Sequence, residues 1–390
     1  MDFELPDDIK MFQRALRDFC ESEIKPHAAH ADETGELPWS AIHKMPALGL
    51  TGLQVDEAYG GAGMDTIAAS VAVEEIGRVC GSTGLSISAH NGLGCGPIAA
   101  WGTPAQKEHW LPILTSGKVL GALALTEPQA GSDLLGGAQV SAVRDGDEWV
   151  INGTKAWITN VSFAPVITVL VRTRPEGGSR SFSMLLVETD REGVTVHPPE
   201  KKMGLKASPT HMISFENVRV PLDNLLGEEG HGFYMTMQTL DSGRISIGAL
   251  SVGLAQGAYE EMVRYAQERK AFGEPIAHKQ LVQEKIANAA VEIEAARTLV
   301  YKAAWMKDAG KDYTKIAAIA KLKASEVAER VCFDAIQIHG SYGYSREYPV
   351  ERMYRDQRLM QIGEGTSEIQ RIVIARRVLK EFEQGVLLPV

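Results

Sequence analysis

The 390-residue chain is predicted to be a multidomain α+β protein, because its hydrophobic period changes twice along the sequence. Helical spacing prevails up to about residue 120, β-rich runs fill residues 121–217, and helical spacing returns after the glycines of residues 227–232. A chain of this length fits two or three packed units. We therefore expect an N-terminal α-helical domain at 1–120, a middle antiparallel β-domain at 121–230 and a C-terminal four-helix bundle at 231–390.

Two helices are clear in the N-terminal third. The first is marked by five apolar residues at near-helical spacing: Ile9, Phe12, Leu16, Phe19 and Ile24. We expect it to stop at Pro26, since proline breaks a helix. A second amphipathic run covers residues 65–80 and ends at Gly81, and shorter helical stretches are expected at 40–48 and 103–114.

Short β-rich runs follow one another in the middle third, at residues 122–125, 149–151, 156–159, 166–171, 182–187, 194–196 and 212–215. Asn152-Gly153 lies between two of these runs and is a strong signal for a two-residue hairpin turn. The runs therefore predict an antiparallel sheet.

The last third carries four long helical patterns, at residues 243–269, 282–303, 317–338 and 367–382. The second pattern alternates spacings of four and three, as in a heptad seam for helix packing, through Val282, Ile286, Ala289, Ile293, Ala296, Val300 and Ala303. Gly310 ends this pattern, and the short connection to the next helix implies an antiparallel neighbour. These features predict the four-helix bundle.

Composition excludes several classes of function. A formal charge of −10 and a pI near 5.6, without any basic tract, argue against a nucleic-acid partner. We find no signal-like N-terminus and no apolar stretch long enough to span a membrane, so an untargeted, soluble, cytoplasmic protein is expected. His27 and His30 lack further ligands at useful spacing, so no metal site is expected. The four cysteines are far apart and predict neither disulfides nor a zinc site: Cys20, Cys80, Cys95 and Cys332.

The most informative segment is Gly363-Glu364-Gly365, a lone carboxylate between two glycines before a helix that should begin near Thr366. Ser367 and Gln370 have the spacing of a capping box. The glycines would let a planar cofactor and an extended substrate approach Glu364 closely, as a general base requires. Burial would raise the pKa of Glu364 and the positive helix end would lower it. An exposed turn with a solvated charge is the alternative interpretation.

Other segments offer a cofactor site without a Rossmann motif, which the chain lacks. The polar loop at residues 125–133 is suited to hydrogen bonding with the edge of a heterocycle, although alone it is an ordinary turn. Trp157 is interpreted either as a flavin platform or as a core residue. Arg269 and Lys270 end a helix where they would neutralise a pyrophosphate, or would simply be solvated.

Six motifs together resemble the acyl-CoA dehydrogenases in order and approximate spacing over residues 7–379, essentially the whole chain. They lie at residues 125–133, 157–160, 241–244, 268–273, 337–340 and 364–366. The resemblance implies the acyl-CoA dehydrogenase fold, which has the same three-domain division, together with FAD as cofactor and an acyl-CoA thioester as substrate. It further implies electron-transfer flavoprotein as a partner and a homo-oligomer, expected to be a tetramer built as a dimer of dimers.

The resemblance also implies roles for individual residues, with Glu364 as the catalytic base. Flavin contacts would come from Leu123, Leu125, Thr126, Gly131, Ser132, Trp157, Ile158 and Thr159. The FAD of a neighbouring subunit would be reached by Arg269, Phe272, Gln280, Gln337, Ile338, His339, Gly340 and Ser341. The adenosine part of FAD would be held by Thr366, Ser367 and Glu368. The substrate would be contacted by Ser132, Asp241, Ser242, Gly243, Arg244 and Gly365.

In this family the base removes the α-proton of the thioester, its backbone N–H helps to polarise the carbonyl, and the flavin takes the β-hydrogen as hydride to give a trans-2-enoyl-CoA. Some members place the base two residues after the aspartate at 241, where this chain has Gly243. Two departures are expected to alter the site locally: Gln129 replaces a common glycine, and Gly363 replaces a common aromatic residue.

The motif pattern favours a short or short-branched acyl group, although Gly363 leaves the shape of the acyl pocket open. Two alternatives to a dehydrogenase also stay open: an acyl-CoA oxidase that passes electrons to oxygen, and a non-catalytic flavoprotein binding module.

Overall fold

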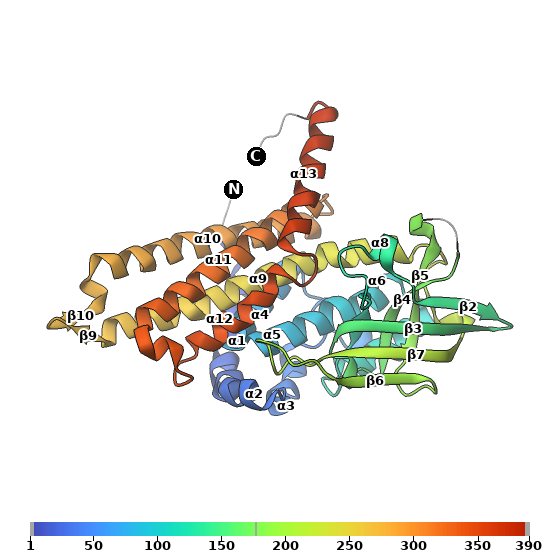
Figure 1. Cartoon of the computed structure of the whole chain (residues 1–390), viewed down its shortest axis with the longest axis horizontal. Coiled ribbons are helices and arrows are strands. Elements are labelled where there is room, and N and C mark those ends of the chain that lie inside the picture. The colour runs from blue at the N-terminus through green and yellow to red at the C-terminus, as the bar shows by residue number, and fades with distance from the viewer. Residues whose placement is uncertain (1–3, 176–177, 387–390) are drawn as a thin grey trace.

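The computed structural model describes residues 4–175 and 178–386. The prediction of an N-terminus without a targeting signal concerns residues 1–3 in part, and these lie outside the described residues. Helices at both ends of the chain pack together beside a β-sheet formed by the middle third (Figure 1). The N-terminal helices are α1 (Asp7–Phe19), α2 (Ala28–Thr34), α3 (Trp39–Ile42), α4 (Thr66–Val79), α5 (Gly81–Ala89), α6 (Gly96–Trp101) and α7 (Pro104–Thr115). In the described ranges no helix is both long enough and apolar enough to cross a bilayer.

The predicted stop of the first helix at Pro26 is wrong. After α1 the chain continues through a π-helical turn, Cys20–Ile24, and a 3-10 turn, Lys25–His27, into α2. Pro26 lies in the first turn of the 3-10 segment, where the missing N–H of a proline leaves no hydrogen bond unmade. The proline therefore changes the hydrogen-bonding pattern without ending the helical path.

Helix α4 agrees with its predicted run, and the Asp65 side chain caps it by accepting from the Ala68 N–H at 2.7 Å. Helix α5 was not predicted. All of its residues are buried, so it presents no polar face and its sequence carries no amphipathic period.

The middle third forms an eight-stranded sheet in the order β6-β7-β3-β2-β4-β5-β8, with β1 paired to β4. Neighbours are antiparallel, as predicted, except that β4 pairs in parallel with β1 and with the first residue of β2. A short helix, α8 (Leu134–Gly137), precedes β2. The strands are β1 (Ala122–Ala124), β2 (Ser141–Asp145), β3 (Glu148–Thr159), β4 (Val166–Arg172), β5 (Phe182–Glu188), β6 (Val194–Pro199), β7 (Thr210–Pro221) and β8 (Leu225–Leu226).

The predicted hairpin at Asn152-Gly153 is wrong, because both residues lie inside the single long strand β3. The pairing of β3 with β7 shifts register between Ile151 and Gly153, which marks a β-bulge. Gly153 has a φ of +130°, and a Cβ there would lie 2.8 Å from the Val140 Cγ2 atom. The same dipeptide that favours a tight turn thus supplies the positive φ of a bulge.

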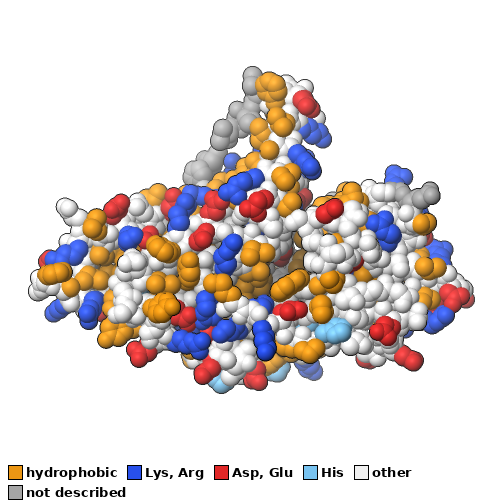
Figure 2. Space-filling model, in the orientation of Figure 1, with side chains coloured by type: hydrophobic (Ala, Val, Ile, Leu, Met, Phe, Trp, Pro, Cys, Tyr) orange, Lys and Arg blue, Asp and Glu red, His pale blue; other side chains and the backbone are white. Residues whose placement is uncertain are grey.

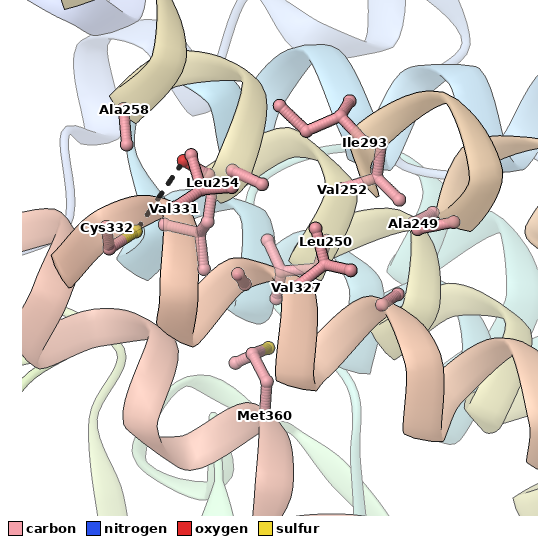
Figure 3. Close-up of a cluster of buried hydrophobic side chains, with 14 of the residues drawn as sticks. Ala249, Leu250, Val252, Leu254, Ala258, Ile293, Val327, Val331, Cys332 and Met360 are labelled. Atoms are coloured by element: carbon pink, nitrogen blue, oxygen red, sulfur yellow. Dashed lines mark hydrogen bonds between the residues drawn. The ribbon is translucent and has the colours of Figure 1, made fainter. Parts of the chain in front are cut away.

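In the described part of the C-terminal third, up to residue 386, there are five α-helices and a small hairpin formed by β9 (Lys270–Ala271) and β10 (Glu274–Pro275). The helices are α9 (Gly232–Glu268), α10 (Gln280–Asp308), α11 (Thr314–His339), α12 (Val350–Gln357) and α13 (Ser367–Glu383). Helices α9, α10 and α11 share a buried core, drawn in Figure 3, that includes Leu250, Leu254, Ile293, Val327 and Val331. Helix α9 begins eleven residues before the predicted start, and α12 was not predicted.

Helix α13, the fourth predicted member of the bundle, is tied to α11 by ion pairs of Arg371 with Glu326 and of Glu381 with Lys315. Its far end projects from the body of the molecule (Figure 1). Apolar side chains on this helix stay exposed, at 44% for Ile372, 62% for Leu379 and 70% for Phe382. On the face shown in Figure 2, basic and acidic side chains are intermixed.

Candidate active site

The Gly363-Glu364-Gly365 segment forms a tight turn between the 3-10 segment Arg358–Gln361 and α13. Glu364 has a φ of +52° and Gly365 a φ of +90°, so the turn holds a non-glycine residue in a left-handed conformation. Such conformations persist only where surrounding contacts hold them, and they concentrate at functional sites.

The predicted capping pair is wrong, although the helix begins where expected. Thr366 is the N-cap and accepts from the Ile369 N–H at 3.3 Å. The Gln370 side chain turns back to donate to the Gly365 carbonyl at 2.9 Å and to the Glu364 carbonyl at 3.3 Å. Gln370 therefore holds the turn instead of closing a capping box with Ser367.

The Glu364 carboxyl group packs directly against α9 at Gly243. Its Oε2 atom is buried and has no hydrogen-bond partner within the described residues. A Cβ atom built on Gly243 would lie only 1.7 Å from this oxygen, so the glycine leaves the space that the carboxyl occupies. Burial raises the pKa of Glu364 to about 7, against the lowering effect of Lys321 and Arg244. The predicted raising effect of burial is thus present, and the opposing charges are those of Lys321 and Arg244.

Charged groups on α9 and α11 surround this carboxyl. Arg244 is buried and forms an ion pair with Asp241, which also accepts from the Thr314 hydroxyl at 2.8 Å. Burial raises the pKa of Asp241. Lys321 is fully buried and donates to the Gly365 carbonyl at 2.7 Å. Asp241, Gly243 and Arg244 were predicted from sequence, whereas Lys321 was missed.

A cavity of about 350 Å³ lies next to Asp241, between α9, the start of α11 and α13. Its lining includes polar and charged side chains of these helices and of the α10–α11 connection: Tyr234, Gln238, Lys311, Tyr313, Thr314 and Arg377. Ser242, also predicted as a substrate contact, shares a hydrogen bond of 3.0 Å with the Tyr313 hydroxyl. Of the predicted substrate residues of α9, Asp241 therefore lines this cavity and Ser242 contacts its Tyr313.

The second half of the candidate site lies in the β-domain, where the end of β3 meets the loop after β1. The Ala156 N–H donates to the Thr126 carbonyl at 2.8 Å and joins the two segments. Trp157 is 59% exposed with a φ of +61°, so it is not a core residue. Leu123, Leu125 and Ile158 are buried, Thr126 and Thr159 are half-buried, and Gly131 and Ser132 are exposed.

A buried ion pair supports this loop from below. The Lys155 ammonium group donates to Glu127 Oε1 and to the Leu125 carbonyl, each at 2.9 Å. Glu127 also accepts from the Val140 N–H at 3.0 Å and from the Gln129 side chain at 2.8 Å. Burial lowers the pKa of Lys155 to about 8 despite Glu127. Gln129, the departure noted in the sequence, therefore adds a donor to the buried carboxylate.

The cofactor residues predicted in residues 269–280 and 337–341 do not lie beside Trp157 and the Leu125–Ser132 loop. Arg269, Phe272 and Gln280 lie around the β9–β10 hairpin, at the opposite end of the helices from the sheet (Figure 1). Phe272 is 95% exposed with a φ of +55°. The segment at the end of α11 comprises the exposed Gln337, Gly340 and Ser341 and the buried Ile338 and His339. Within one chain, the β9–β10 hairpin thus lies away from the sheet that carries Trp157.

Comparison with known proteins identifies the family. Three family models match consecutive parts of the chain: the acyl-CoA dehydrogenase N-terminal domain at residues 6–118, the middle domain at 122–218 and the C-terminal domain at 230–379. The Bacillus subtilis protein named "Probable acyl-CoA dehydrogenase YngJ" is 52% identical over 97% of this chain and 100% of its own length. Bovine mitochondrial short-chain specific acyl-CoA dehydrogenase is 46% identical over 97% and 92%, respectively.

Solved structures agree with the sequence matches. Butyryl-CoA dehydrogenase from Megasphaera elsdenii superimposes with a TM-score of 0.94 at 41% identity, covering 97% of this chain and 100% of that chain. A chain from a structure described as the electron transferring flavoprotein of Acidaminococcus fermentans has a TM-score of 0.95 at 40% identity, with the same coverage.

Members of this family use FAD, and a Bacillus anthracis acyl-CoA dehydrogenase of TM-score 0.91 was solved in complex with it. The side chains of this chain fit such a group. Trp157 offers an exposed indole beside the Leu125–Ser132 loop, and no atom lies within 4 Å of a Cβ built on Gly131. Buried Ser367 Oγ and Gln370 Oε1 atoms have no partner within the described chain. By sequence and by structure over nearly its whole length, the chain belongs to the acyl-CoA dehydrogenase family of FAD-dependent oxidoreductases.

Proposed function

We propose that this enzyme is a short-chain acyl-CoA dehydrogenase, which converts a short or short-branched acyl-CoA to the trans-2-enoyl-CoA with Glu364 as the base. The observation that carries the proposal is the Glu364 carboxyl, whose Oε2 is buried and unpartnered against Gly243 within the described residues. A base must have a free lone pair directed at the substrate and a pKa near the working pH. The pKa of about 7 gives Glu364 both protonation states near neutral pH.

The α-proton of a thioester is very weakly acidic, so its removal requires stabilisation of charge on the thioester oxygen. The Glu364 N–H donates no backbone hydrogen bond among the described residues, which leaves this donor free for the thioester carbonyl. Proton removal and carbonyl polarisation would then come from one residue of a turn held by Gln370 and Lys321. FAD, when bound, supplies the oxidant that accepts the β-hydrogen as hydride.

The substrate would lie between this turn and the β-domain, with its CoA part toward the cavity beside Asp241. Contacts are proposed for Ser132, Asp241, Ser242, Gly243, Arg244 and Gly365. Relatives named as short-chain and butyryl-CoA dehydrogenases support a short acyl group. The nearest atoms to a Cβ on Gly363 belong to Leu359, at an ordinary contact distance of 3.6 Å, so the missing aromatic ring leaves room beside the base.

For FAD we propose two groups of contacts within one subunit, around Trp157 and the Leu125–Ser132 loop and at Thr366–Glu368. The residues around Arg269 and His339 lie too far along the helices to join them in the same chain. They would complete the site of a neighbouring subunit, so we propose a homo-oligomer, as a tetramer built from two dimers. The exposed apolar face of α13 supports such an assembly.

We further propose that electron-transfer flavoprotein accepts the electrons, a partner supported by the family and by one structural neighbour. The domain bounds of 1–120, 121–230 and 231–390 also remain proposals.

The test is Glu364→Gln, which removes the base but keeps the size of the side chain. We expect purified Glu364→Gln protein to keep its yellow FAD and to lose nearly all anaerobic flavin reduction by acyl-CoA thioesters in stopped flow. Glu383→Gln, an exposed carboxyl on α13, is the matched control and should reduce normally. Normal flavin reduction by the Glu364→Gln protein would overturn the assignment. A panel of acyl-CoA substrates with the native enzyme would identify the acyl group by flavin bleaching, and peroxide release under air would indicate an oxidase instead.

A further inference from the structure

Lys321 is a buried cation placed beneath the turn that carries Glu364. It lies on α11 with none of its surface exposed, and its Nζ donates to the Gly365 carbonyl at 2.7 Å. A buried ammonium group is costly to desolvate unless nearby negative charge compensates it. No carboxylate within the described residues forms an ion pair with Lys321 at salt-bridge distance. Its compensation must therefore come from carbonyl oxygens and from charges that lie farther away.

The charged groups that face Lys321 are few. They are Glu364 on the turn, Arg244 on α9 and Glu368 on α13. Burial, together with Arg244, lowers the pKa of Lys321 to about 8 against the raising effect of Glu364 and Glu368. Arg244 is itself neutralised by Asp241 on the same helix. Glu368 is exposed to solvent, which screens its charge. The field of Lys321 is therefore available mainly to Glu364, whose own pKa Lys321 lowers more than Arg244 does.

The Gly365 carbonyl is held from two sides. Lys321 donates to it from α11, and Gln370 donates to it from α13 at 2.9 Å. Gln370 is neutral and belongs to the same segment as the turn, so it can shape the turn locally. Lys321 ties the turn to α11, which belongs to the α9–α11 core, and it also brings a positive charge. The hydrogen bonding to the turn and the positive charge near Glu364 can therefore be tested separately by substitution.

We propose that Lys321 is a positioning residue for the reaction, which fixes the Glu364–Gly365 turn through the Gly365 carbonyl and favours the ionised form of the Glu364 carboxyl. The inference rests on the proposed role of Glu364 as the base. Ionised Glu364 removes the α-proton, so the rate of flavin reduction should rise with pH as this carboxyl ionises. Without the positive charge, ionisation requires a higher pH.

The test compares Lys321→Gln, which keeps a donor without the charge, with Lys321→Arg, which keeps both. In stopped-flow flavin reduction at saturating acyl-CoA, Lys321→Gln should move the rising limb of the pH profile upward by about one to three units. Its rate at pH 7 should fall by about fivefold or more and recover at alkaline pH. Lys321→Arg should keep the native midpoint even if its maximal rate is lower.

Lys323→Gln is the matched control, because Lys323 lies on the same helix and pairs with Glu292 at the surface. It should leave the pH profile unchanged. An unshifted midpoint in folded, FAD-loaded Lys321→Gln would overturn the inference, provided that Glu364→Gln is inactive. Lys321→Met, a second neutral variant, should show the same shift. Loss of FAD binding in both neutral variants, with a normal Lys321→Arg, would assign Lys321 to folding and also overturn the inference. Inactivity of the native enzyme toward every acyl-CoA would instead contradict the proposed function itself.

Discussion

The raised pKa of Glu364 predicts a pH-dependent cost to stability that Glu364→Gln removes. Burial moves this pKa from 4.5 to about 7, so the folded protein binds the carboxyl proton more tightly than the unfolded chain does. The associated stability is fully present below pH 4.5 and is lost as the pH rises through 7. At about 1.4 kcal/mol per pKa unit, the ionised carboxylate destabilises the folded state by about 3 kcal/mol above pH 7.

The assay is thermal unfolding of the FAD-loaded native and Glu364→Gln proteins at pH 5.0 and pH 7.5. Both values stay below the lowered pKa of Lys321 near 8, which limits interference from that group. Between these pH values the native protein should lose about 2.4 kcal/mol relative to the variant, from the two-state linkage relation. For a chain of 390 residues the unfolding entropy is roughly 0.8 kcal/mol/K, so the difference in Tm between variant and native should grow by about 3 °C.

A difference in Tm that is the same at both pH values would refute the reasoning, because it would mean that the Glu364 carboxyl titrates at its ordinary pKa. A larger difference at pH 5.0 than at pH 7.5 would reverse the sign and exclude burial as the dominant influence.

Three further substitutions test other parts of the structure. Gly243→Ala places a methyl group where the Glu364 Oε2 lies, so flavin reduction should slow by about 100-fold with FAD retained; an unchanged rate in stopped flow would contradict this packing. Lys155→Met leaves the Glu127 carboxylate unpaired beneath the flavin loop and should destabilise the protein by about 3 to 5 kcal/mol; urea unfolding measures this loss, and a change below about 1 kcal/mol would not fit a buried pair. Thr366→Ala removes the N-cap of α13 and should cost about 1 kcal/mol in the same assay; an unaltered unfolding midpoint would show that another group satisfies the Ile369 N–H.

Elements whose sequences alternate polar and apolar faces could be predicted. The seam of α10, for example, buries Ala289, Ile293 and Val300 as the heptad pattern indicates. Elements buried on every side could not be predicted, because α5 has no polar face to reveal its period. Asn152-Gly153 shows a different limit: a local dipeptide allows either a turn or a bulge, and pairing with β7 decides between them.

In the candidate site, too, some residues could be predicted from the sequence and others could not. Glu364 and its glycines were visible in the sequence, because their residue types and spacing suit a base presented by a turn. Lys321 and Lys155 were missed, since a lysine in a sequence looks like a surface residue until its buried surroundings are known. The run Ile316–Ala324, in which Lys321 stands among alanines and isoleucines, is the signal that could have indicated a buried cation.

The contact between Gly243 and Glu364 constrains how this enzyme could change. A carboxylate on α9 at position 243 and one on the turn at position 364 would have to share the same volume, so the two arrangements are mutually exclusive. Adding a carboxylate at position 243 first would make it clash with Glu364. Removing the Glu364 carboxylate first would abolish the proposed proton abstraction. Moving the base from position 364 to position 243 therefore requires substitutions at both positions together, and evolution by single substitutions would not easily make this change.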